Sequence, residues 1–493
     1  MAKLTAVIDI GSNSVRLVIF ERTSRFGFHT IHESKSRVRI GEGAYNKGGV
    51  LQDEPMERAY FALQSFSSII QSFKVRKTLA IATSALRDAP NRSVFINRIR
   101  KDFGIGIKVI DGKREAYFGG VACANLLQVD SRSTTIDIGG GSTEFALIEG
   151  KKVIETHSLN LGSVRLKEFF DETTPDFKGA REYISAILDT LPESFYQSTV
   201  IGIGGTIRAL SKMIAKDNSY PMPKIHGYSF EYYGTYRSSL NSILEMNNLE
   251  LISAGIKRER IDVIRWGTLI FLEVLNRFHS DRIISSGVGI REGLFLTDIL
   301  RNSNHQFPNN FNPSLRTMLD QFKSHYPNQS MIGDVSKRIF DLTKHRLELD
   351  NSYRKHITYA SKLIGTGIDV DFYGKTKNGF YLILNRLIYQ IDHKDTILIA
   401  FLVRYNRKWD IPKKSYGEFF ELLPKLETVK KLNTILSLAS TLLSHYPKDR
   451  DMDIDLIGDT ITVKTSDYAK YIIEERLADY KPEEFFKIEI FSR

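Results

Sequence analysis

Hydrophobic runs alternate with short polar turns over the first part of the chain, and two of these runs share one pattern. Residues 4–20 (LTAVIDIGSNSVRLVIF) and 134–148 (TTIDIGGGSTEFALI) each contain an apolar run, the sequence Asp-Ile-Gly, a small polar turn and a second apolar run. β-Branched residues on both sides of a Gly, Ser and Asn cluster predict a strand, a tight turn and a returning strand. The pattern therefore predicts two hairpins, with Asp9 and Asp137 at their mouths.

Helices and strands are predicted to alternate after each hairpin. Residues 57–73 have the pattern of a helix, 77–89 of a strand that runs into a loop, and 107–120 of a strand that runs into a helix. Residues 199–210 and 282–294 each predict a buried strand that ends in a glycine-rich turn and starts a helix. This order is typical of an α/β fold, and the two halves look like duplicated lobes.

The composition of the sequence changes near residue 301. Residues 301–314 are polar, Asn-rich and twice interrupted by Pro, which predicts a linker. Further on, residues 429–443 place apolar side chains at three- and four-residue steps, which predicts a core-facing helix. Residues 453–491 predict a hairpin, a helix and a strand, so the chain should end in a small α/β segment.

Composition favours an anionic partner and a reducing compartment. The 69 basic and 58 acidic residues give a net charge of +11, which suits polyphosphate, nucleotide or nucleic acid. The single cysteine, Cys123, excludes an internal disulfide framework. Asp9 interrupts the first apolar stretch, and the longest apolar run, residues 396–403, is far shorter than the roughly 20 residues that span a bilayer. We therefore expect a cytoplasmic protein without a membrane segment.

The two predicted turns are candidate phosphate sites. Glycines let successive backbone N–H groups converge on one point, and small polar side chains add donors. The loop positions concerned are Ser12, Asn13, Gly140, Gly141, Ser142 and Thr143. Two such turns facing each other would grip a phosphate chain. The alternative is a pair of tight turns with no ligand, in which each Asp only accepts backbone hydrogen bonds.

Seven motifs in this order resemble the exopolyphosphatase and guanosine pentaphosphate phosphohydrolase family (Ppx/GppA phosphatases), a branch of the sugar kinase, heat-shock-70 and actin superfamily. They are DIGSNSVRL (9–17), ATSALRDA (82–89), DGKREA (111–116), DIGGGSTE (137–144), LNLGSVRL (159–166), GIGGT (202–206) and GVGIREG (287–293). The resemblance implies an α/β fold with two ribonuclease H-like lobes, followed by an all-helical His-Asp-like domain and a small C-terminal α/β segment. The expected ranges are 1–125 and 126–300 for the lobes, 301–314 for the linker, 315–425 for the helical domain and 426–493 for the final domain.

The resemblance also implies roles for individual residues. Asp9, Asp137 and Glu144 resemble metal-facing carboxylates for Mg²⁺. Glu115 corresponds to the proposed water-activating base, although its spacing alone predicts an exposed helix charge. A carboxylate that faces a polyanion has a raised pKa, which suits a base near neutrality. The expected phosphate contacts are Arg87, Arg165 and Arg291.

The implied activity is Mg²⁺-dependent release of terminal orthophosphate. The family's substrates are inorganic polyphosphate and guanosine pentaphosphate, which is converted to the tetraphosphate, and the family suggests a homodimer without specific nucleic-acid binding. Two alternatives stay open, namely an ATP-using kinase or ATPase of the same superfamily and a non-catalytic sensor of these guanosine nucleotides. Glu115, Asp137 and Glu144 together argue against a pure binder.

Residues 315–425 resemble a His-Asp domain that lacks its metal ligands. Ile364 and Gly365 stand at the His and Asp positions, and further histidine positions hold Thr376, Asn378 and Asn406. A neutral Asn is a poor replacement for a metal-binding His. The remaining histidines, expected to be structural or exposed, are His325, His345, His356 and His393. We therefore predict no second active site there, but a part that lengthens a basic channel, holds a long polyanion or makes a dimer contact.

Overall fold

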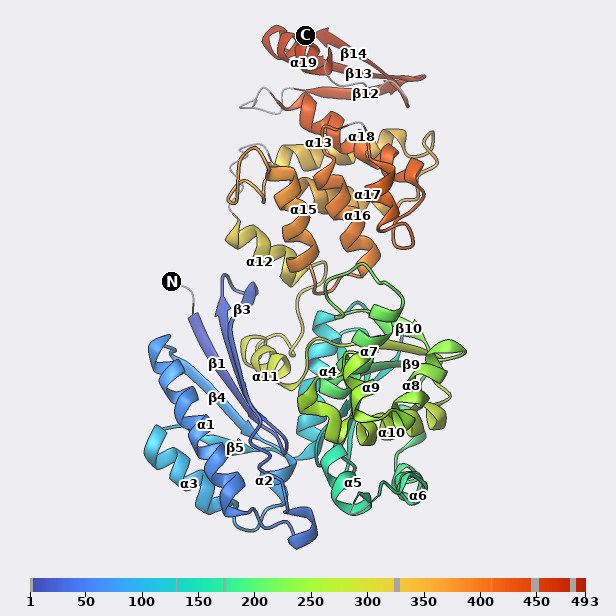
Figure 1. Ribbon diagram of the computed structural model, residues 1–493. Helices are drawn as coiled ribbons and strands as arrows, with labels where there is room; N and C mark the ends of the chain where they lie inside the picture. Colours follow the sequence, from blue (N-terminus) through green and yellow to red (C-terminus); the bar gives the residue numbers. More distant parts are fainter. Residues whose placement is uncertain are drawn as a thin grey trace. The chain divides into compact units, whose positions relative to one another are not determined.

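The computed structural model describes residues 3–129, 131–171, 174–322, 329–408, 410–444, 452–478 and 485–493. The chain divides into two compact units (Figure 1). The first contains residues 1–220 and 224–313, and the second contains residues 221–223 and 314–493. The first unit is built on two sheets, whereas the second combines helices with a small third sheet.

The first lobe is a five-stranded sheet with the order β3-β2-β1-β4-β5. Its elements are β1 (Lys3–Ile10), β2 (Val15–Arg22), β3 (Phe28–Ser36), α1 (Asp53–Ser72), β4 (Lys77–Ala82), α2 (Ser84–Asp88), α3 (Arg92–Phe103) and β5 (Ile107–Val109). The hairpin partners β1 and β2 are antiparallel, while β1 and β4 are parallel. Ile8, Ile10 and Leu17 are fully buried, so apolar burial fixes the register of the central strands.

The second lobe repeats this topology. Its sheet has the order β10-β11-β9-β6-β7-β8, in which β6 pairs antiparallel with β7 and parallel with β9. Its elements are β6 (Ser133–Ile138), β7 (Thr143–Glu149), β8 (Lys152–Leu159), α5 (Ser163–Phe170), α6 (Phe177–Leu188), β9 (Thr199–Ile203), α7 (Gly204–Asp217), β10 (Ser229–Glu231), α8 (Thr235–Glu245), α9 (Asn248–Ser253), α10 (Ile261–Phe278) and β11 (Arg282–Ser285). Both predicted hairpins are confirmed, and each opens a sheet of the same order.

Two helices pack on the opposite lobe. Each follows the last strand of one lobe but covers the sheet of the other. Helix α4 (Gly112–Leu126) follows β5, yet Gly120 packs against Ala146 of β7 and Val153 of β8. Helix α11 (Ile290–Ile299) follows β11, yet the ring of Phe295 stacks on Phe20 of β2 with centroids 4.4 Å apart. Figure 1 shows α11 beside the first sheet and α4 beside the second. The predicted boundary near residue 125 therefore does not separate two independently packed lobes.

The two exchanged helices also touch each other. A Cβ on Gly293 of α11 would lie 1.8 Å from the carbonyl oxygen of Phe118 on α4. Real Cβ atoms never come this close to an oxygen, so only glycine permits the crossing.

Residues 301–313, most of the predicted linker, pack onto the first unit. The side chain of Asn125 donates to the carbonyl of His305 at 2.8 Å and accepts from the N–H of Phe307 at 3.0 Å. The rings of Phe307 and Phe311 lie 6.1 and 5.6 Å from Phe26. The polar composition predicted a linker, but these aromatic side chains anchor the segment.

The second unit consists of a helical layer and a three-stranded sheet. Its elements are α12 (Pro313–Gln321), α13 (Gln329–Thr343), α14 (Tyr353–Leu363), α15 (Lys375–Arg386), α16 (His393–Arg404), α17 (Lys413–Gly417), α18 (Leu426–Leu442), β12 (Asp453–Ile457), β13 (Thr460–Thr465), α19 (Asp467–Ala478) and β14 (Lys487–Ser492). Val429, Leu432 and Leu436 are fully buried on α18, as their spacing predicts. The hairpin of β12 and β13 is extended by β14, which runs parallel to β13.

The longest apolar run of the sequence, residues 396–403, lies within α16, where its side chains are buried. Among the described residues, no helix is both long enough and apolar enough to cross a membrane.

Candidate active site

The two hairpins place their Asp residues at equivalent positions. Asp9 is the last residue but one of β1, and Asp137 is the last but one of β6. The cross-strand partner of Asp9 is Arg16, whereas that of Asp137 is Glu144. Directly opposed residues of an antiparallel pair point to the same face. The first hairpin therefore presents a carboxylate with a cation, and the second presents two carboxylates.

Tight turns follow both Asp residues. The N–H of Gly11 donates to the carbonyl of Ser14 at 3.1 Å, and that of Gly139 donates to the carbonyl of Ser142 at 2.9 Å. The hydroxyl of Ser12 is buried, with Oγ 2.9 Å from Oγ of Ser84. Both turns are thus held in one conformation, which suits a preformed anion site.

Both turns open into one cavity of about 160 Å³. Of the residues predicted for the site, Asp9, Ser12, Asn13, Glu115, Asp137, Gly140, Ser142, Glu144 and Arg291 line it. The first residues of α5, α7 and α11 line it as well. Helix N-termini carry partial positive charge and free N–H donors, so three of them favour an anion here.

Glu115 enters the cavity from the first turn of α4. The side chain of Asp111 caps this helix by accepting from the N–H of Arg114 at 2.7 Å. Nη1 of Arg87 lies 3.2 Å from Oε2 of Glu115. Burial and the negative charge of Glu144 raise the pKa of Glu115 well above its usual range, although Arg87 opposes this shift. Glu115 is therefore a buried carboxylate with a raised affinity for a proton, which is a property of a general base.

The other carboxylates are also shifted. Burial raises the pKa of Glu144 to about 8, although the hydroxyl of Ser158 donates to Oε1 at 2.9 Å. Burial raises the pKa of Asp137 to about 6, against the opposing charge of Arg208. Burial likewise raises the pKa of Asp9. Burial therefore disfavours the charged form of each of these carboxylates.

Gly204 fixes the approach of α7 to Asp137. Its φ of +90° is unfavourable for other residues, and a Cβ would lie 2.6 Å from Oδ1 of Asp137. A side chain at this position would displace the carboxylate.

Cationic side chains that sequence reasoning missed face the same cavity. They are Arg16, Lys35, Arg208 and Arg260, which line it together with Arg291. Burial, with the charges of Arg16 and Arg291, lowers the pKa of Arg208 to about 10. Several positive side chains this close together are the arrangement expected for a site that binds a polyanion. Arg16 lies inside a quoted motif and Arg208 lies two residues after one, but Lys35 and Arg260 had no local signal.

Four predicted site residues do not line the cavity, namely Arg87, Gly141, Thr143 and Arg165. Arg87 contacts Glu115 from outside, as described above. Nε of Arg165 donates to the carbonyl of Gly141 at 2.9 Å, and its guanidinium lies 4.4 Å from the ring centroid of Tyr45. The hydroxyl of Thr143 donates to the carbonyl of Leu161. In this structure Arg165 and Thr143 brace the second turn instead of facing the cavity.

The donor set of the cavity fits Mg²⁺. Within the described ranges, no three His, Cys, Asp or Glu side chains converge as a metal-binding group. Mg²⁺ commonly binds through one or two carboxylates and completes its shell with water and phosphate oxygens. Asp137 and Glu144 are oxygen donors on paired strands, and their raised pKa values would fall in the presence of a dication.

His356 of the second unit has structural surroundings. Nε2 of His356 lies 2.6 Å from Oδ1 of Asp395, and the His356 ring is buried. At the positions where a His-Asp domain has ligands, Ile364 is buried and Asn406 accepts from the hydroxyl of Ser440 at 3.2 Å. His325 lies outside the described residues.

Comparisons with known proteins show which proteins this chain resembles. The bifunctional 3-dehydroquinate synthase/phosphatase of Fusobacterium nucleatum is 32% identical over 307 residues, which cover 57% of this chain and 45% of that protein. The guanosine-5′-triphosphate,3′-diphosphate pyrophosphatase of Aliivibrio fischeri is 26% identical over 373 residues, which cover 73% of this chain and 67% of that protein. The chain thus spans less than half of the first of these relatives.

A solved structure shares the fold. The crystal structure of an exopolyphosphatase from Cytophaga hutchinsonii matches with a TM-score of 0.56 and 27% identity, over 62% of this chain and all of that one. The predicted fold of two actin-like lobes is therefore confirmed. A model of the Ppx/GppA phosphatase family matches residues 18–302, which contain six of the seven motifs, all except the one at 9–17. The chain therefore belongs to the Ppx/GppA phosphatase family.

Proposed function

We propose that this chain is a Mg²⁺-dependent phosphoanhydride hydrolase that releases terminal orthophosphate from inorganic polyphosphate, from guanosine pentaphosphate, or from both. The observation that carries the proposal is that two turns with backbone N–H donors, the buried carboxylate of Glu115 and five cationic side chains line one cavity. The names of the relatives support it, because one is a guanosine-5′-triphosphate,3′-diphosphate pyrophosphatase and another is an exopolyphosphatase.

The terminal phosphate binds against the two turns. The N–H groups of Ser12, Asn13 and Gly140, with the hydroxyl of Ser142, donate to its oxygens. Guanidinium groups such as Arg208 take the following phosphates, because their planar fork matches two oxygens at once. Such fixed donors stabilise the charge that spreads over the transferred phosphoryl group.

Glu115 orients the attacking water and takes its proton. The new bond joins the water oxygen to the terminal phosphorus, and the bond to the bridging oxygen breaks, so the shortened chain leaves with the electron pair. The guanidinium groups that hold the following phosphates stabilise the charge on the departing chain. Arg87, at 3.2 Å from Glu115, fixes the orientation of the carboxylate and limits its pKa.

Asp137 and Glu144, with Asp9 across the cavity, are the residues that would hold Mg²⁺. When bound, Mg²⁺ would neutralise negative charge on the phosphate oxygens. A polyanion could then lie close to the carboxylates. The serine hydroxyl of Ser158 keeps Glu144 in place by its hydrogen bond to Oε1.

The test is release of orthophosphate by the purified full-length chain. Polyphosphate, guanosine pentaphosphate and ATP are supplied in turn, with Mg²⁺ and with EDTA. We expect turnover of one or both of the first two substrates with Mg²⁺ alone. Turnover of ATP only would favour the kinase or ATPase reading, and tight binding of guanosine nucleotides without release would favour the sensor.

A further inference from the structure

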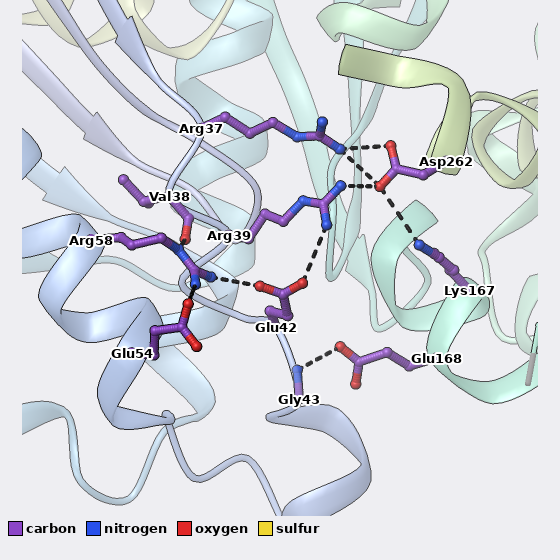
Figure 2. Close-up of polar contacts among 10 residues, drawn as sticks. All are labelled: Arg37, Val38, Arg39, Glu42, Gly43, Glu54, Arg58, Lys167, Glu168 and Asp262. Carbon is purple, nitrogen blue, oxygen red and sulfur yellow. Dashed lines mark hydrogen bonds and ion pairs between the residues drawn. The ribbon is translucent and has the colours of Figure 1, made fainter. Parts of the chain in front are cut away.

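Outside the catalytic cavity, the carboxylate of Asp262 contacts three cationic side chains. Nη2 of Arg37 donates to both oxygens of Asp262, at 2.6 and 2.8 Å. Arg39 also donates to Oδ2 of Asp262, and Nζ of Lys167 lies 3.6 Å from the same oxygen. Figure 2 shows the three cations converging on this one side chain. One negative charge therefore faces three positive charges.

The cations come from both lobes. Arg37 and Arg39 lie in the segment after β3, while Lys167 belongs to α5 and Asp262 to the first turn of α10. A second carboxylate, Glu42, is already shared, because it accepts from Arg39 at 3.2 Å and from Arg58 at 2.5 Å. Three cations therefore share Asp262, and Nε of Arg37 is a buried donor with no partner in the described structure.

An external anion can reach this point. The side chains of Asp262 and Lys167 are 25% and 35% exposed. Arg39, Lys167 and Asp262 line a cavity of about 580 Å³ together with the carboxylates of Glu42, Glu168 and Asp171. Asn13 and Val263 line both this cavity and the catalytic one. A phosphate chain whose end lies at the Ser12–Asn13 turn can therefore continue past Asn13 towards the three cations.

We propose that Arg37, Arg39 and Lys167 form a second anion site for substrate phosphates remote from the cleaved end, and that Asp262 fills it until such phosphates displace the carboxylate. The identity of the substrate rests on the proposed function. Phosphate and carboxylate both match the guanidinium fork, but a condensed phosphate offers more oxygens and more charge to three cations than one Asp does. Asp262 is then a specificity residue, because a short substrate cannot reach it and gains nothing by displacing it.

The test measures binding to the full-length chain in EDTA, where turnover does not interfere. The probes are tripolyphosphate against long-chain polyphosphate, and GTP against guanosine 5′-triphosphate 3′-diphosphate. The paired probes separate the two sources of remote phosphate, namely a longer chain and a 3′-diphosphate. We expect Asp262→Asn to bind the larger probe of at least one pair about 3- to 10-fold more tightly and the smaller probe nearly unchanged.

Two controls separate displacement from a general change of charge. Glu54→Gln makes the same charge change nearby. Within the described residues Glu54 pairs with Arg58, at 2.8 Å, and not with the three cations at Asp262, so this variant should leave all affinities unchanged. In an Arg37→Gln, Arg39→Gln background the effect of Asp262→Asn should vanish, and Lys167→Gln should reduce it. Thermal unfolding checks that each variant is folded.

Three outcomes overturn the proposal: equal tightening of small and large probes, persistence of the effect without the two arginines, or weaker binding by Asp262→Asn. The last is expected if Asp262 only holds the lobes together. If the probes bind as expected but no phosphate is released with Mg²⁺, the proposed function fails while this site stands. If no probe binds, both fail.

Discussion

Replacing Glu115 by Gln removes the proposed base while the shape of the site stays the same. The amide keeps an oxygen for Nη1 of Arg87, which lies 3.2 Å from Oε2. The N-terminus of α4 is unaffected, because its cap is Asp111. Since the cavity that surrounds Glu115 is already formed by the two hairpins, an isosteric change should leave the packing intact.

The expected effect is a loss of turnover without a loss of binding. General base catalysis contributes about 10²- to 10⁴-fold, which corresponds to about 3–5.5 kcal/mol of activation free energy. Five cationic side chains and four carboxylates line the cavity, so Glu115→Gln makes it more positive. An anionic substrate should then bind at least as tightly as before. The signature is a lower kcat with an equal or lower KM.

Steady-state phosphate release at saturating Mg²⁺ measures both parameters for Glu115→Gln. Glu149→Gln is the matched control, because Glu149 is exposed at the end of β7 and does not line the cavity. It should behave like the unmodified chain. Turnover of Glu115→Gln within about tenfold of normal would remove Glu115 from the mechanism. A raised KM with a large drop in melting temperature would show a structural role instead.

Other predictions concern the metal, the fold and the second unit. Asp137→Ala should raise the Mg²⁺ concentration for half-maximal phosphate release, and an unchanged Mg²⁺ requirement with lower stability would make Asp137 a turn residue. Gly293→Ala should lower the free energy of unfolding by about 2–4 kcal/mol in urea titrations, because the 1.8 Å approach to Phe118 outweighs the roughly 1 kcal/mol that Ala gains in a helix; an unchanged midpoint would contradict this. Burial raises the pKa of Cys123 to about 12, so the neutral thiol should react with a disulfide reagent only after unfolding, and fast labelling of the native chain would refute this. A chain ending at residue 313 should still release phosphate from tripolyphosphate but lose affinity for long polyphosphate; equal affinity would show that the second unit does not hold the substrate.

Local signals in the sequence predicted the two hairpins correctly, together with helices α1, α4, α7, α11, α18 and α19. The runs around Asp9 and Asp137 combine β-branched residues with glycine turns, a pattern that depends only on neighbouring residues. The apolar stripe of α18 is equally local. Such features need no knowledge of the partner element, because the period alone identifies the element.

The sequence did not indicate which surfaces the helices cover. The apolar faces of α4 and α11 show that both are buried, but a helix pattern does not name the sheet that it meets. The small residues of α4, such as Gly119 and Gly120, allow a close approach to a neighbour and say nothing of its identity. The segment at 301–313 was misread for the same reason, since the Asn125 side chain that holds it is 180 residues away from His305.

The site residues that were predicted lie inside the quoted motifs, whereas Lys35, Arg208 and Arg260 lie outside them and were missed, as was Arg16 within the first motif. Glu115 and Glu144 lie within quoted motifs and reach the cavity. Lys35 and Arg260 come from segments more than 220 residues apart, so only the folded chain brings them together. For Arg165 the motif indicated phosphate contact, but its position is fixed by the Gly141 carbonyl, a contact that sequence does not show.

The exchange of α4 and α11 constrains the order in which the protein can be made. During synthesis the first sheet emerges early, but Phe20 and Phe28 stay without their partner until Phe295 of α11 has left the ribosome. Transiently exposed apolar surface of this kind promotes misassembly and calls for chaperones. The N-terminal lobe should therefore reach its native stability only after about 300 residues have been translated, and a nascent chain arrested before α11 should remain sensitive to protease in β1 and β2.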